Sequence, residues 1–301
     1  LDINKNRVGR FMRDIEILGS ISDISKIVEI LEKKNKRPQK IIIANNDIEG
    51  NVVRKLLTFA DKTGISLARL PKITDLESNV NSEKLRIKPI DVFDLLSRPQ
   101  SLLDRNSMKK FIYNKKVLVT GAGGTIGSEL VNQIIKYNPN EIVLLDNSEY
   151  LLYKIERTLE EKKLKIKINS FLADIKNVKR INDIFKENKP EIVFHAAALK
   201  HVPLVEKNPL EGILTNIMGT INIAEACTKY EITEMVLIST DKAVNPFSVM
   251  GVTKRISEKY CQSISSKSKC SFKIVRFGNV LGSTGSVVPL FQRQLEKGGP
   301  I

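Results

Sequence analysis

The sequence predicts the α/β class: a doubly wound parallel sheet preceded by a smaller α/β domain. Short apolar runs alternate along the chain with segments of helical period, which is typical of βαβ units. The runs are apolar on both faces, which indicates a parallel sheet covered by helices on each side. One run, at residues 116–120, opens directly into clustered glycines. Such a junction is typical of the first crossover of a doubly wound sheet.

The larger domain is predicted to occupy residues 104–301. Its strands are expected at residues 116–120, 141–146, 166–173, 191–198, 234–240 and 272–277. Helices are expected between them at residues 128–137, 150–162, 178–188, 219–230 and 250–265. In such a sheet the chemistry belongs at the carboxyl ends of the strands.

The smaller domain is predicted to occupy residues 1–103 as a Rossmann-like unit of the nucleotide-binding type. Strands are expected at residues 15–18, 40–44 and 65–70, and helices near residues 23–34 and 48–63. This part shows no glycine-rich phosphate loop. Residues 89–105, with Pro89 and Pro99, are expected to form a packed connector.

The composition is that of a globular protein, with 42% hydrophobic and 28% charged residues among 301. The net charge of +15 suggests nucleic-acid binding, but acids stand between the lysines and only 6% of residues are aromatic. We therefore expect no nucleic-acid partner, and favour a solvated surface that faces an anionic membrane or substrate. No apolar run reaches the roughly 18 residues of a membrane-spanning helix.

Three cysteines, Cys227, Cys261 and Cys270, lack metal-binding spacing, and the chain has two histidines. We expect reduced structural thiols in a cytosolic compartment and no metal site. The sequence lacks a starting Met and stops at Ile301, so both ends are expected to be cut from something longer.

The glycines at residues 121–127 predict a dinucleotide site. Gly121 permits a tight turn, Gly124 lets backbone amides approach a pyrophosphate, and Gly127 lets the next helix pack closely. The helix directs its N-terminal dipole and free amides at the phosphates, where Thr125 and Ile126 are also expected to contact the cofactor. The plainer alternative is a strand-to-helix turn without a ligand. The Gly-x-x-Gly-x-x-Gly spacing resembles that of short-chain dehydrogenases/reductases.

The strand at residues 141–146 ends in Asp146, about twenty residues beyond the loop, where a carboxylate accepts both adenosine ribose hydroxyls. A carboxylate would repel a 2′-phosphate, and Asn147 rather than Arg follows it. The predicted cofactor is therefore NAD and not NADP.

Further cofactor contacts are expected at the ends of two other strands. Asp174 and its neighbour Ile175 follow the third strand, near the predicted adenine, although Asp174 equally suits a cap for the helix near residue 178. The small side chains of Ala196, Ala197 and Ala198 suit a cofactor lying against the sheet; close helix packing is the alternative.

The strand at residues 234–240 ends in Thr240, Asp241 and Lys242, which brings a hydroxyl, an acid and an amine together. These residues are either a structural ion pair or, at the catalytic edge, the reacting groups. On the next helix, Lys254 is expected to hold the nicotinamide ribose. Met250 stands four residues earlier, where this enzyme class normally has its basic Tyr, and a thioether cannot accept the proton.

Substrate contacts are predicted in three later segments. Lys200 and His201 either line a sugar pocket or form a polar turn. Asn279 and the nearby Arg276 lie at a strand end and suit a phosphate or sugar, with a turn-forming Asn as the alternative; Arg293 suits a diphosphate or a solvated helix. Asn216 either fixes backbone near the site or is an ordinary polar helix residue.

Long blocks of the sequence closely resemble the nucleotide-sugar 4,6-dehydratases of the polysaccharide-biosynthesis (CapD-like) group, within the extended short-chain dehydrogenase/reductase superfamily. The blocks are GAGGTIGSEL, FHAAALKHVPLVEKNPLEGILTNIMGT, LISTDKAVNPFSVMGVTKR and RFGNVLGSTGSVVPLF. The earlier GRFMRDIEILGS and IIIANNDIEG resemble the N-terminal domain of the large, membrane-anchored members. A Met in the Tyr position is itself characteristic of those members.

The resemblance implies an NAD-dependent hydro-lyase that converts UDP-N-acetylglucosamine to UDP-4-keto-6-deoxy-N-acetylglucosamine with retention at C5, for surface polysaccharide synthesis. It also implies a homo-oligomer at the cytoplasmic face of the inner membrane, held by an anchor absent from this chain.

In the expected mechanism, oxidation at C4 acidifies the C5 proton. Lys242, if its pKa is depressed, removes that proton, and a protonated Asp241 donates one to the departing 6-hydroxyl. Thr240 hydrogen-bonds the C4 oxygen. Since Met250 is excluded as base, Thr240 with water and Lys254 is the suggested acceptor of the C4 hydroxyl proton. The rival functions are a nucleotide-sugar 4-epimerase and a catalytically inactive NAD-binding regulatory module.

Overall fold

A parallel sheet of six strands, ordered β8-β7-β6-β9-β10-β11, forms the centre of the larger of two units. The computed structural model describes residues 1–2, 4–45, 48–70, 88–89, 104–162, 164–280, 291 and 294. The chain divides into Leu1–Leu102 and Leu103–Ile301. The strands are β6 (Lys116–Thr120), β7 (Glu141–Asp146), β8 (Lys167–Leu172), β9 (Ile192–His195), β10 (Glu234–Thr240) and β11 (Ser271–Phe277).

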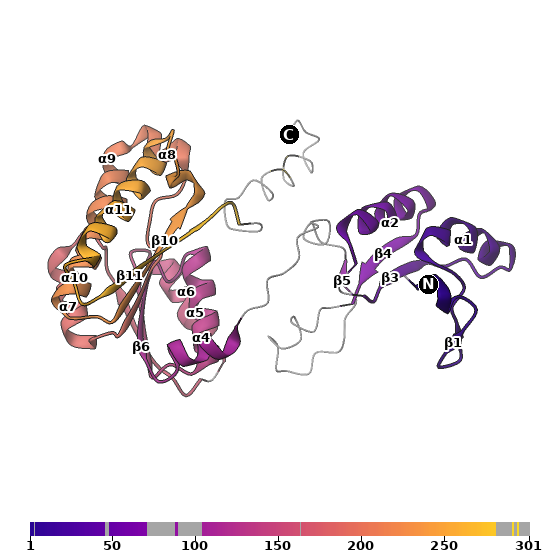
Figure 1. Ribbon diagram of the computed structural model, residues 1–301, viewed down its shortest axis with the longest axis horizontal. Coiled ribbons are helices and arrows are strands. Elements are labelled where there is room, and N and C mark those ends of the chain that lie inside the picture. Colours follow the sequence, from indigo (N-terminus) through magenta and orange to yellow (C-terminus); the bar gives the residue numbers. More distant parts are fainter. Residues whose placement is uncertain are drawn as a thin grey trace. The chain divides into compact units, whose positions relative to one another are not determined.

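Helices cover both faces of this sheet (Figure 1). One layer contains α4 (Arg105–Ile112), α5 (Thr125–Ile134) and α6 (Glu149–Glu160). The other contains α7 (Val178–Asn188), α10 (Gly219–Lys229) and α11 (Val249–Ser265). The short elements are η4 (Ile135–Tyr137), α8 (Val202–Lys207), α9 (Pro209–Gly212), the π-helical η5 (Ile213–Met218) and η6 (Asp241–Ala243). The larger unit is thus the doubly wound α/β fold that the sequence predicts.

The two cores follow from the alternation of side chains along each strand. In β6, Val117 and Val119 pack with α4, α5 and α6, whereas Leu118 between them packs with α7, α10 and α11. All three side chains are fully buried. A strand buried on both faces needs apolar residues at every position, which explains the continuous apolar run in the sequence.

The strand order reverses between β6 and β9, which are hydrogen-bonded neighbours although β7 and β8 lie between them in sequence. Connections leave the sheet in opposite directions at this point, so a crevice opens outside the carboxyl ends of the strands. The candidate site is therefore expected beside Thr120 and His195, the last residues of these two strands.

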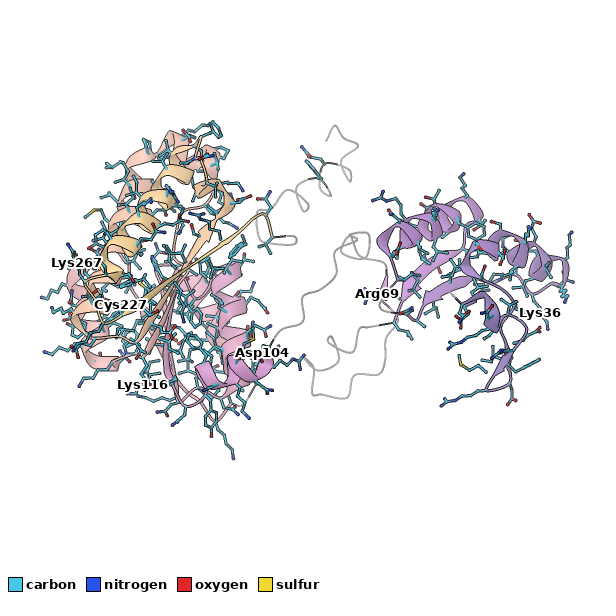
Figure 2. The ribbon with its side chains drawn as sticks, viewed as in Figure 1. Lys36, Arg69, Asp104, Lys116, Cys227 and Lys267 are labelled. Carbon is cyan, nitrogen blue, oxygen red and sulfur yellow. The ribbon has the colours of Figure 1, made fainter. Side chains whose placement is uncertain are left out.

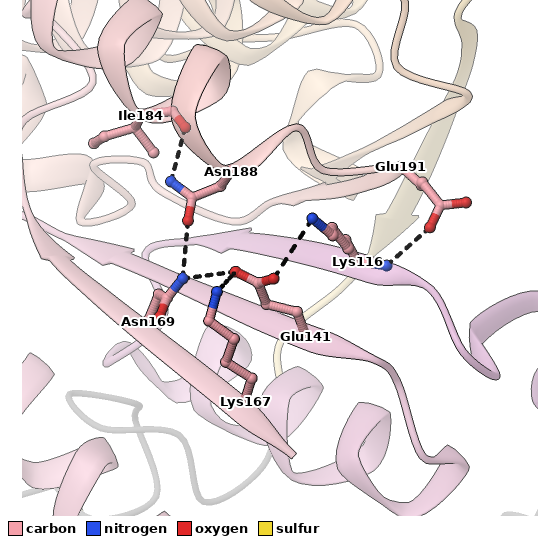
Figure 3. A network of polar contacts seen from close by, with 7 residues as sticks. All are labelled: Lys116, Glu141, Lys167, Asn169, Ile184, Asn188 and Glu191. Carbon is pink, nitrogen blue, oxygen red and sulfur yellow. Dashed lines mark hydrogen bonds and ion pairs between the residues drawn. The ribbon is translucent and has the colours of Figure 1, made fainter.

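At the opposite, amino edge of the sheet, the buried carboxylate of Glu141 holds neighbouring strands together (Figure 3). It accepts hydrogen bonds from Asn169 Nδ2 at 2.6 Å and Lys167 Nζ at 3.2 Å. Lys116 Nζ lies 3.7 Å away, and Asn169 Nδ2 also donates to Asn188 Oδ1. These contacts join β6, β7, β8 and α7 far from the crevice.

The smaller unit has its own core and a sheet of three strands. Its β3 (Lys40–Ile43) pairs in parallel with β4 (Ser66–Arg69), and β5 (Lys88–Pro89) pairs with β4 in antiparallel fashion. The remaining elements are η1 (Lys5–Arg7), β1 (Phe11–Met12), β2 (Ile15–Glu16), η2 (Ile21–Asp23), α1 (Ile24–Lys33) and α2 (Gly50–Thr63).

Several predicted boundaries are wrong. The strand expected at residues 15–18 is only Ile15–Glu16, and it forms an antiparallel hairpin with β1 outside the parallel pair. The strand expected at residues 191–198 ends at His195, because the following alanines line the crevice. The helix expected from residue 128 begins at Thr125. Most of the predicted connector at residues 89–105 lies outside the described residues.

Cys227, Cys261 and Cys270 are free thiols buried in the core between the sheet and the helices α7, α10 and α11. Cys227 is labelled in Figure 2. At the start of the larger unit, Asp104 caps α4 by accepting hydrogen bonds from the amides of Asn106 and Ser107. Across the described ranges, no helix is long and apolar enough to span a bilayer.

Candidate functional site

The turn after β6 brings two backbones into direct contact at the switch point. Gly121 has φ +65°, in the left-handed region that favours glycine. A Cβ atom at Gly121 would lie 2.7 Å from the backbone nitrogen of Ala197, closer than any real contact. Any other residue would therefore separate the end of β6 from the segment after β9.

The same turn places the N-terminus of α5 at the crevice. A Cβ at Gly127 would lie 1.9 Å from the carbonyl oxygen of Gly121, so only glycine allows this packing. Gly124 is the N-cap, and Thr125 and Ile126 occupy the first turn. First-turn amides have no acceptor within their own helix, and with the helix dipole they form a site suited to a phosphate.

Asp146 ends β7 beside this turn with a 6% exposed side chain. Its Oδ2 accepts a hydrogen bond from Gly123 N at 2.9 Å, and its Oδ1 accepts one from Ser148 N at 2.9 Å. The carboxylate is thereby fixed, while each oxygen retains a further lone pair for a ligand hydroxyl. Sequence reasoning missed Gly123, whose Cβ would lie 2.5 Å from Leu151 Cβ; the paired glycines were its only signal.

These groups line one crevice with an empty volume of about 640 Å³, including its open mouth. The predicted cofactor residues among its lining are Gly121, Gly124, Asp146, Asp174, Ile175, Ala196, Ala197 and Ala198. The lining residues that the sequence did not single out are Leu145, Leu151, Ala173, Leu199 and Thr215. Asn147, which follows Asp146, also lines the crevice.

The alternative role of Asp174 as a helix cap is wrong. Asn177 caps α7 instead, because its side chain accepts a hydrogen bond from Arg180 N. Asp174 accepts one from Lys176 N at 2.8 Å, within its own turn, and faces the crevice.

A buried chain of hydrogen bonds crosses the switch point through His195. Thr120 Oγ1 lies 2.7 Å from His195 Nδ1, and His195 Nε2 lies 3.0 Å from Thr220 Oγ1. The hydroxyl of Thr220 donates its hydrogen bond to the carbonyl of Asn216. His195 Nε2 must therefore carry a proton and donate a hydrogen bond to Thr220. Thr120 then donates to Nδ1 and accepts from Ala197 N. Burial, with a smaller contribution from Lys254, lowers the pKa of His195 to about 3, so the ring is neutral.

Asn216 fixes the loop after β9, as one of the two sequence alternatives proposes. Its side chain, fully buried, accepts from Leu199 N at 2.8 Å and donates to Leu199 O at 3.0 Å. It also donates to Thr253 Oγ1 on α11. The residue sits in the π-helical turn η5, a distortion often found at functional sites.

At the ends of β10 and β11, four predicted site residues meet. Thr240 Oγ1 donates to Asp241 Oδ1 at 2.9 Å, and Lys242 Nζ donates to the same oxygen at 3.1 Å. Lys242 Nζ also donates to Asn279 Oδ1 at 3.0 Å. The Asp241 and Lys242 side chains are 57% and 38% exposed, so they face a space that a ligand can enter.

The protonated Asp241 expected from the sequence is not what these contacts favour. Hydrogen bonds from Thr240 and then Lys242 lower the pKa of Asp241 below its ordinary value. Without substrate, Asp241 is therefore an ionised partner of Lys242.

Met250 and Lys254 lie one turn apart on α11 and are both buried. Burial, only partly offset by Cys261 and Glu258, lowers the pKa of Lys254 from 10.5 to about 8. Lys254 thus keeps a charge at neutral pH but yields its proton easily. Met250 brings no titratable group to the position.

The crevice lining includes none of the other predicted catalytic and substrate residues, namely Thr240, Asp241, Lys242, Met250, Lys254, Asn279, Lys200 and His201. Lys200 and His201 are exposed on the loop after Leu199, and His201 precedes α8. Arg293 lies outside the described residues. Arg276 donates two hydrogen bonds to Glu258, which hold its guanidinium against α11 and not in the crevice lining. Among the residues the structure describes, no group of His, Cys, Asp and Glu is arranged to hold a metal ion.

Comparison with known proteins identifies the family of the chain and several named relatives. The profile of the family described as "Polysaccharide biosynthesis protein" matches residues 117–301. The capsular polysaccharide biosynthesis protein CapD of Staphylococcus aureus is 43% identical over 302 residues, which cover 100% of this chain and 49% of that protein. The chain thus spans about half the length of this curated relative.

Two shorter matches concern nucleotide-sugar enzymes. A UDP-N-acetylglucosamine 4,6-dehydratase (inverting) of Campylobacter jejuni is 33% identical, covering 62% of this chain and 56% of its own. A UDP-glucose 4-epimerase of Rickettsia bellii is 34% identical, covering 61% and 54%. The solved structure of Pen from Bacillus thuringiensis superposes with a TM-score of 0.59 at 35% identity, covering 62% of this chain and 59% of that one. Both of these curated relatives are named as nucleotide-sugar enzymes, one a dehydratase and the other an epimerase.

The buried histidine yields a prediction that needs no ligand. The imidazole of His195 is expected to stay neutral and protonated on Nε2 throughout the native pH range. In a His201→Gln variant it is the only imidazole of this sequence, so ¹⁵N NMR reports its protonation state directly. Below pH 6.5 the imidazole of His195 binds a second proton in the unfolded chain but not in the folded chain. The free energy of unfolding is therefore expected to fall by roughly 1.4 kcal/mol per pH unit as the pH is lowered from 6.5 toward 3. An imidazolium or an Nδ1–H signal at pH 6 would contradict the assigned network.

Proposed function

Since this chain belongs to the polysaccharide biosynthesis protein family, we propose that it dehydrates a UDP-sugar with NAD as cofactor. The substrate is UDP-N-acetylglucosamine and the product is UDP-4-keto-6-deoxy-N-acetylglucosamine with retention at C5, for surface polysaccharide synthesis. The observation that carries the proposal is the meeting of Thr240, Asp241, Lys242 and Asn279 at the sheet edge that holds the glycine-lined crevice.

The crevice residues fit NAD. Gly121 and Gly127 leave no room for a side chain, and the first turn of α5 presents its amides for a pyrophosphate. Asp146 suits the two adenosine ribose hydroxyls and would repel the 2′-phosphate of NADP. The small side chains of Ala196, Ala197 and Ala198 leave room for a cofactor along the crevice. Lys254 suits the nicotinamide ribose. When bound, NAD would accept hydride from C4 of the sugar and return it to C6, so that the overall reaction is a dehydration with no net oxidation.

The acid and base follow from the ion pair at the end of β10. Lys242 must lose a proton to act as base toward C5, and Asp241 must gain one to act as acid toward the 6-hydroxyl. One proton passing from Lys242 Nζ to Asp241 Oδ1, over 3.1 Å, produces both forms at once. A sugar that displaces water disfavours the two charges and so drives this transfer. The C5 proton then goes to Lys242, and the 6-hydroxyl leaves with the proton of Asp241 as water.

The first step, oxidation at C4, needs a proton acceptor that Met250 cannot provide. Thr240 suits the C4 oxygen as a hydrogen-bond partner. The lowered pKa of Lys254, about 8, leaves a minor neutral fraction near neutral pH that accepts this proton through Thr240 and water.

A nucleotide-sugar 4-epimerase is the second candidate, because the epimerase relative is about as similar as the dehydratase relative. The acid–base pair Asp241–Lys242 and the Met at position 250 favour dehydration. Product mass decides, because epimerisation leaves the mass unchanged and dehydration removes one water. A regulatory module would bind NAD and turn over no UDP-sugar.

We further propose that the protein works as a homo-oligomer at the cytoplasmic face of the inner membrane, held by an anchor outside this sequence. This proposal is supported by the resemblance to large membrane-anchored members and by the CapD relative, about twice as long.

Variants of the ion pair test the acid and base. Asp241→Asn and Lys242→Met are each expected to lower kcat for UDP-N-acetylglucosamine by about 10²–10⁴-fold in the complete protein, because each removes one proton-transfer group. Binding of NAD, measured by calorimetry, should persist. Asp183→Asn and Lys186→Met, exposed on α7 away from the crevice, are matched controls. Normal turnover by either site variant would refute the assignment.

The pKa of Lys254 sets the pH dependence of NAD binding. The ammonium form dominates below pH 8 and is lost above it, so affinity should fall as the pH rises through about 8. Since only the charged fraction binds well, the apparent Kd is expected to rise about tenfold between pH 7 and pH 9. Calorimetric titration measures it, and Lys254→Met should bind weakly and without this pH dependence. An equally steep dependence in Lys254→Met would assign the effect to another group.

A further inference from the structure

Glu258 is a fully buried carboxylate on α11, one helical turn after Lys254. Its Oε1 accepts hydrogen bonds from Ser239 Oγ at 2.6 Å and Arg276 Nε at 2.8 Å. Its Oε2 accepts from Arg276 Nη2 at 2.5 Å and Arg255 Nη1 at 3.3 Å. Although burial, the largest influence, raises the pKa of Glu258, the bonds from Arg276 and Ser239 together lower it below the ordinary value.

The two outer partners of Glu258 come from the strands that end in the candidate catalytic groups. Ser239 directly precedes Thr240 in β10, and Arg276 lies three residues before Asn279 in β11. The helix itself carries Met250 and Lys254 and lies against both strands (Figure 1). One side chain therefore joins all three segments that supply the site beyond the crevice.

We propose that Glu258 is a positioning residue that holds the ends of β10 and β11 in register with α11, so that Lys242, Asn279 and Lys254 face one ligand. This proposal rests on the proposed function for the meaning of that alignment. We call Glu258, Ser239 and Arg276 the Glu258 clamp.

The geometry around the clamp leaves little tolerance. A Cβ atom at Gly278 would lie 3.3 Å from Asp241 Oδ2, so the two strand ends already touch without any side chain between them. Beyond this contact, Lys242 Nζ reaches Asn279 Oδ1 at 3.0 Å. A shift of one strand by about 1 Å would break that bond, and misplacement of this size costs on the order of 10²-fold in rate.

The charge of Glu258 is needed as well as its shape. Both oxygens accept two donors each, so a carboxylate has its acceptor sites filled. In Glu258→Gln an amide nitrogen must point its hydrogens at an Arg or Ser donor, and the half-buried guanidinium of Arg276 loses its counter-ion. The strand end attached to that guanidinium is then released.

The plain alternative is an ion pair that only stabilises the fold, and Glu141 provides the matched control. Glu141 is also a buried carboxylate that joins neighbouring strands and accepts from Lys and Asn donors, but at the amino edge (Figure 3). Glu141→Gln and Glu258→Gln make the same chemical change in the same sheet. A merely structural role predicts the same consequences for both.

The test compares the two variants in the complete protein with NAD and UDP-N-acetylglucosamine. Both are expected to lower the unfolding midpoint, but only Glu258→Gln should lower kcat, on the order of 10²-fold, with little change in KM. Hydrogen–deuterium exchange should rise at residues 239–242 and 276–279 in Glu258→Gln and not in Glu141→Gln. If Glu258→Gln does not fold, Ser239→Ala and Arg276→Lys each weaken one arm and should show smaller losses of the same kind.

Equal kcat losses in the two Gln variants, or unchanged exchange at both strand ends in Glu258→Gln, would overturn the clamp. If the wild-type protein turns over no UDP-sugar, the proposed function fails, while the exchange comparison still decides whether Glu258 aligns the strand ends.

Discussion

The close approach of Gly121 to Ala197 is the constraint on which the rest of the site depends. A side chain at position 121 would meet the backbone nitrogen of Ala197 at 2.7 Å, so the turn after β6 must be glycine. This contact brings the phosphate-binding type of turn against the segment after β9, where the strand order reverses. The same turn positions α5 through the approach of Gly127 to Gly121, and its Gly123 amide binds the carboxylate of Asp146.

Buried polar groups fix the positions of the strands along their own axes, which the apolar core does not determine. The core specifies which face of each strand is inward, but a sheet of aliphatic side chains tolerates small displacements along the strands. His195, Asn216 and Glu258 each have a network of directed hydrogen bonds that tolerates no such displacement. They tie β6 to β9, the loop after β9 to α11, and α11 to the ends of β10 and β11. The reactive side chains stay exposed above this rigid layer.

The fold and part of the site could be predicted because their causes are local in sequence. The strands β6, β7 and β10 follow from apolar runs, and the roles of Gly121 and Gly127 in the turn follow from glycine spacing alone. The partners of Gly123, Asn216 and Glu258 could not be predicted, because each lies many residues away and depends on the finished packing. Arg276 illustrates this limit: a strand-end arginine suggested substrate binding, but two of its donors bind the buried carboxylate of Glu258 on α11. The charge state of Asp241 likewise depends on Thr240 and Lys242 side-chain conformations that no spacing reveals.

We propose, as the central claim, that one bound dinucleotide extends from the glycine turn to the Thr240–Asp241–Lys242 group. A crystal structure of the complete protein with NAD and UDP tests it most directly. The account predicts the pyrophosphate at the first turn of α5, the adenosine ribose on Asp146, and the nicotinamide beside Thr240 and Lys254. A dinucleotide bound elsewhere, or a nicotinamide remote from Thr240 with Asp241 and Lys242 facing only solvent, would contradict it.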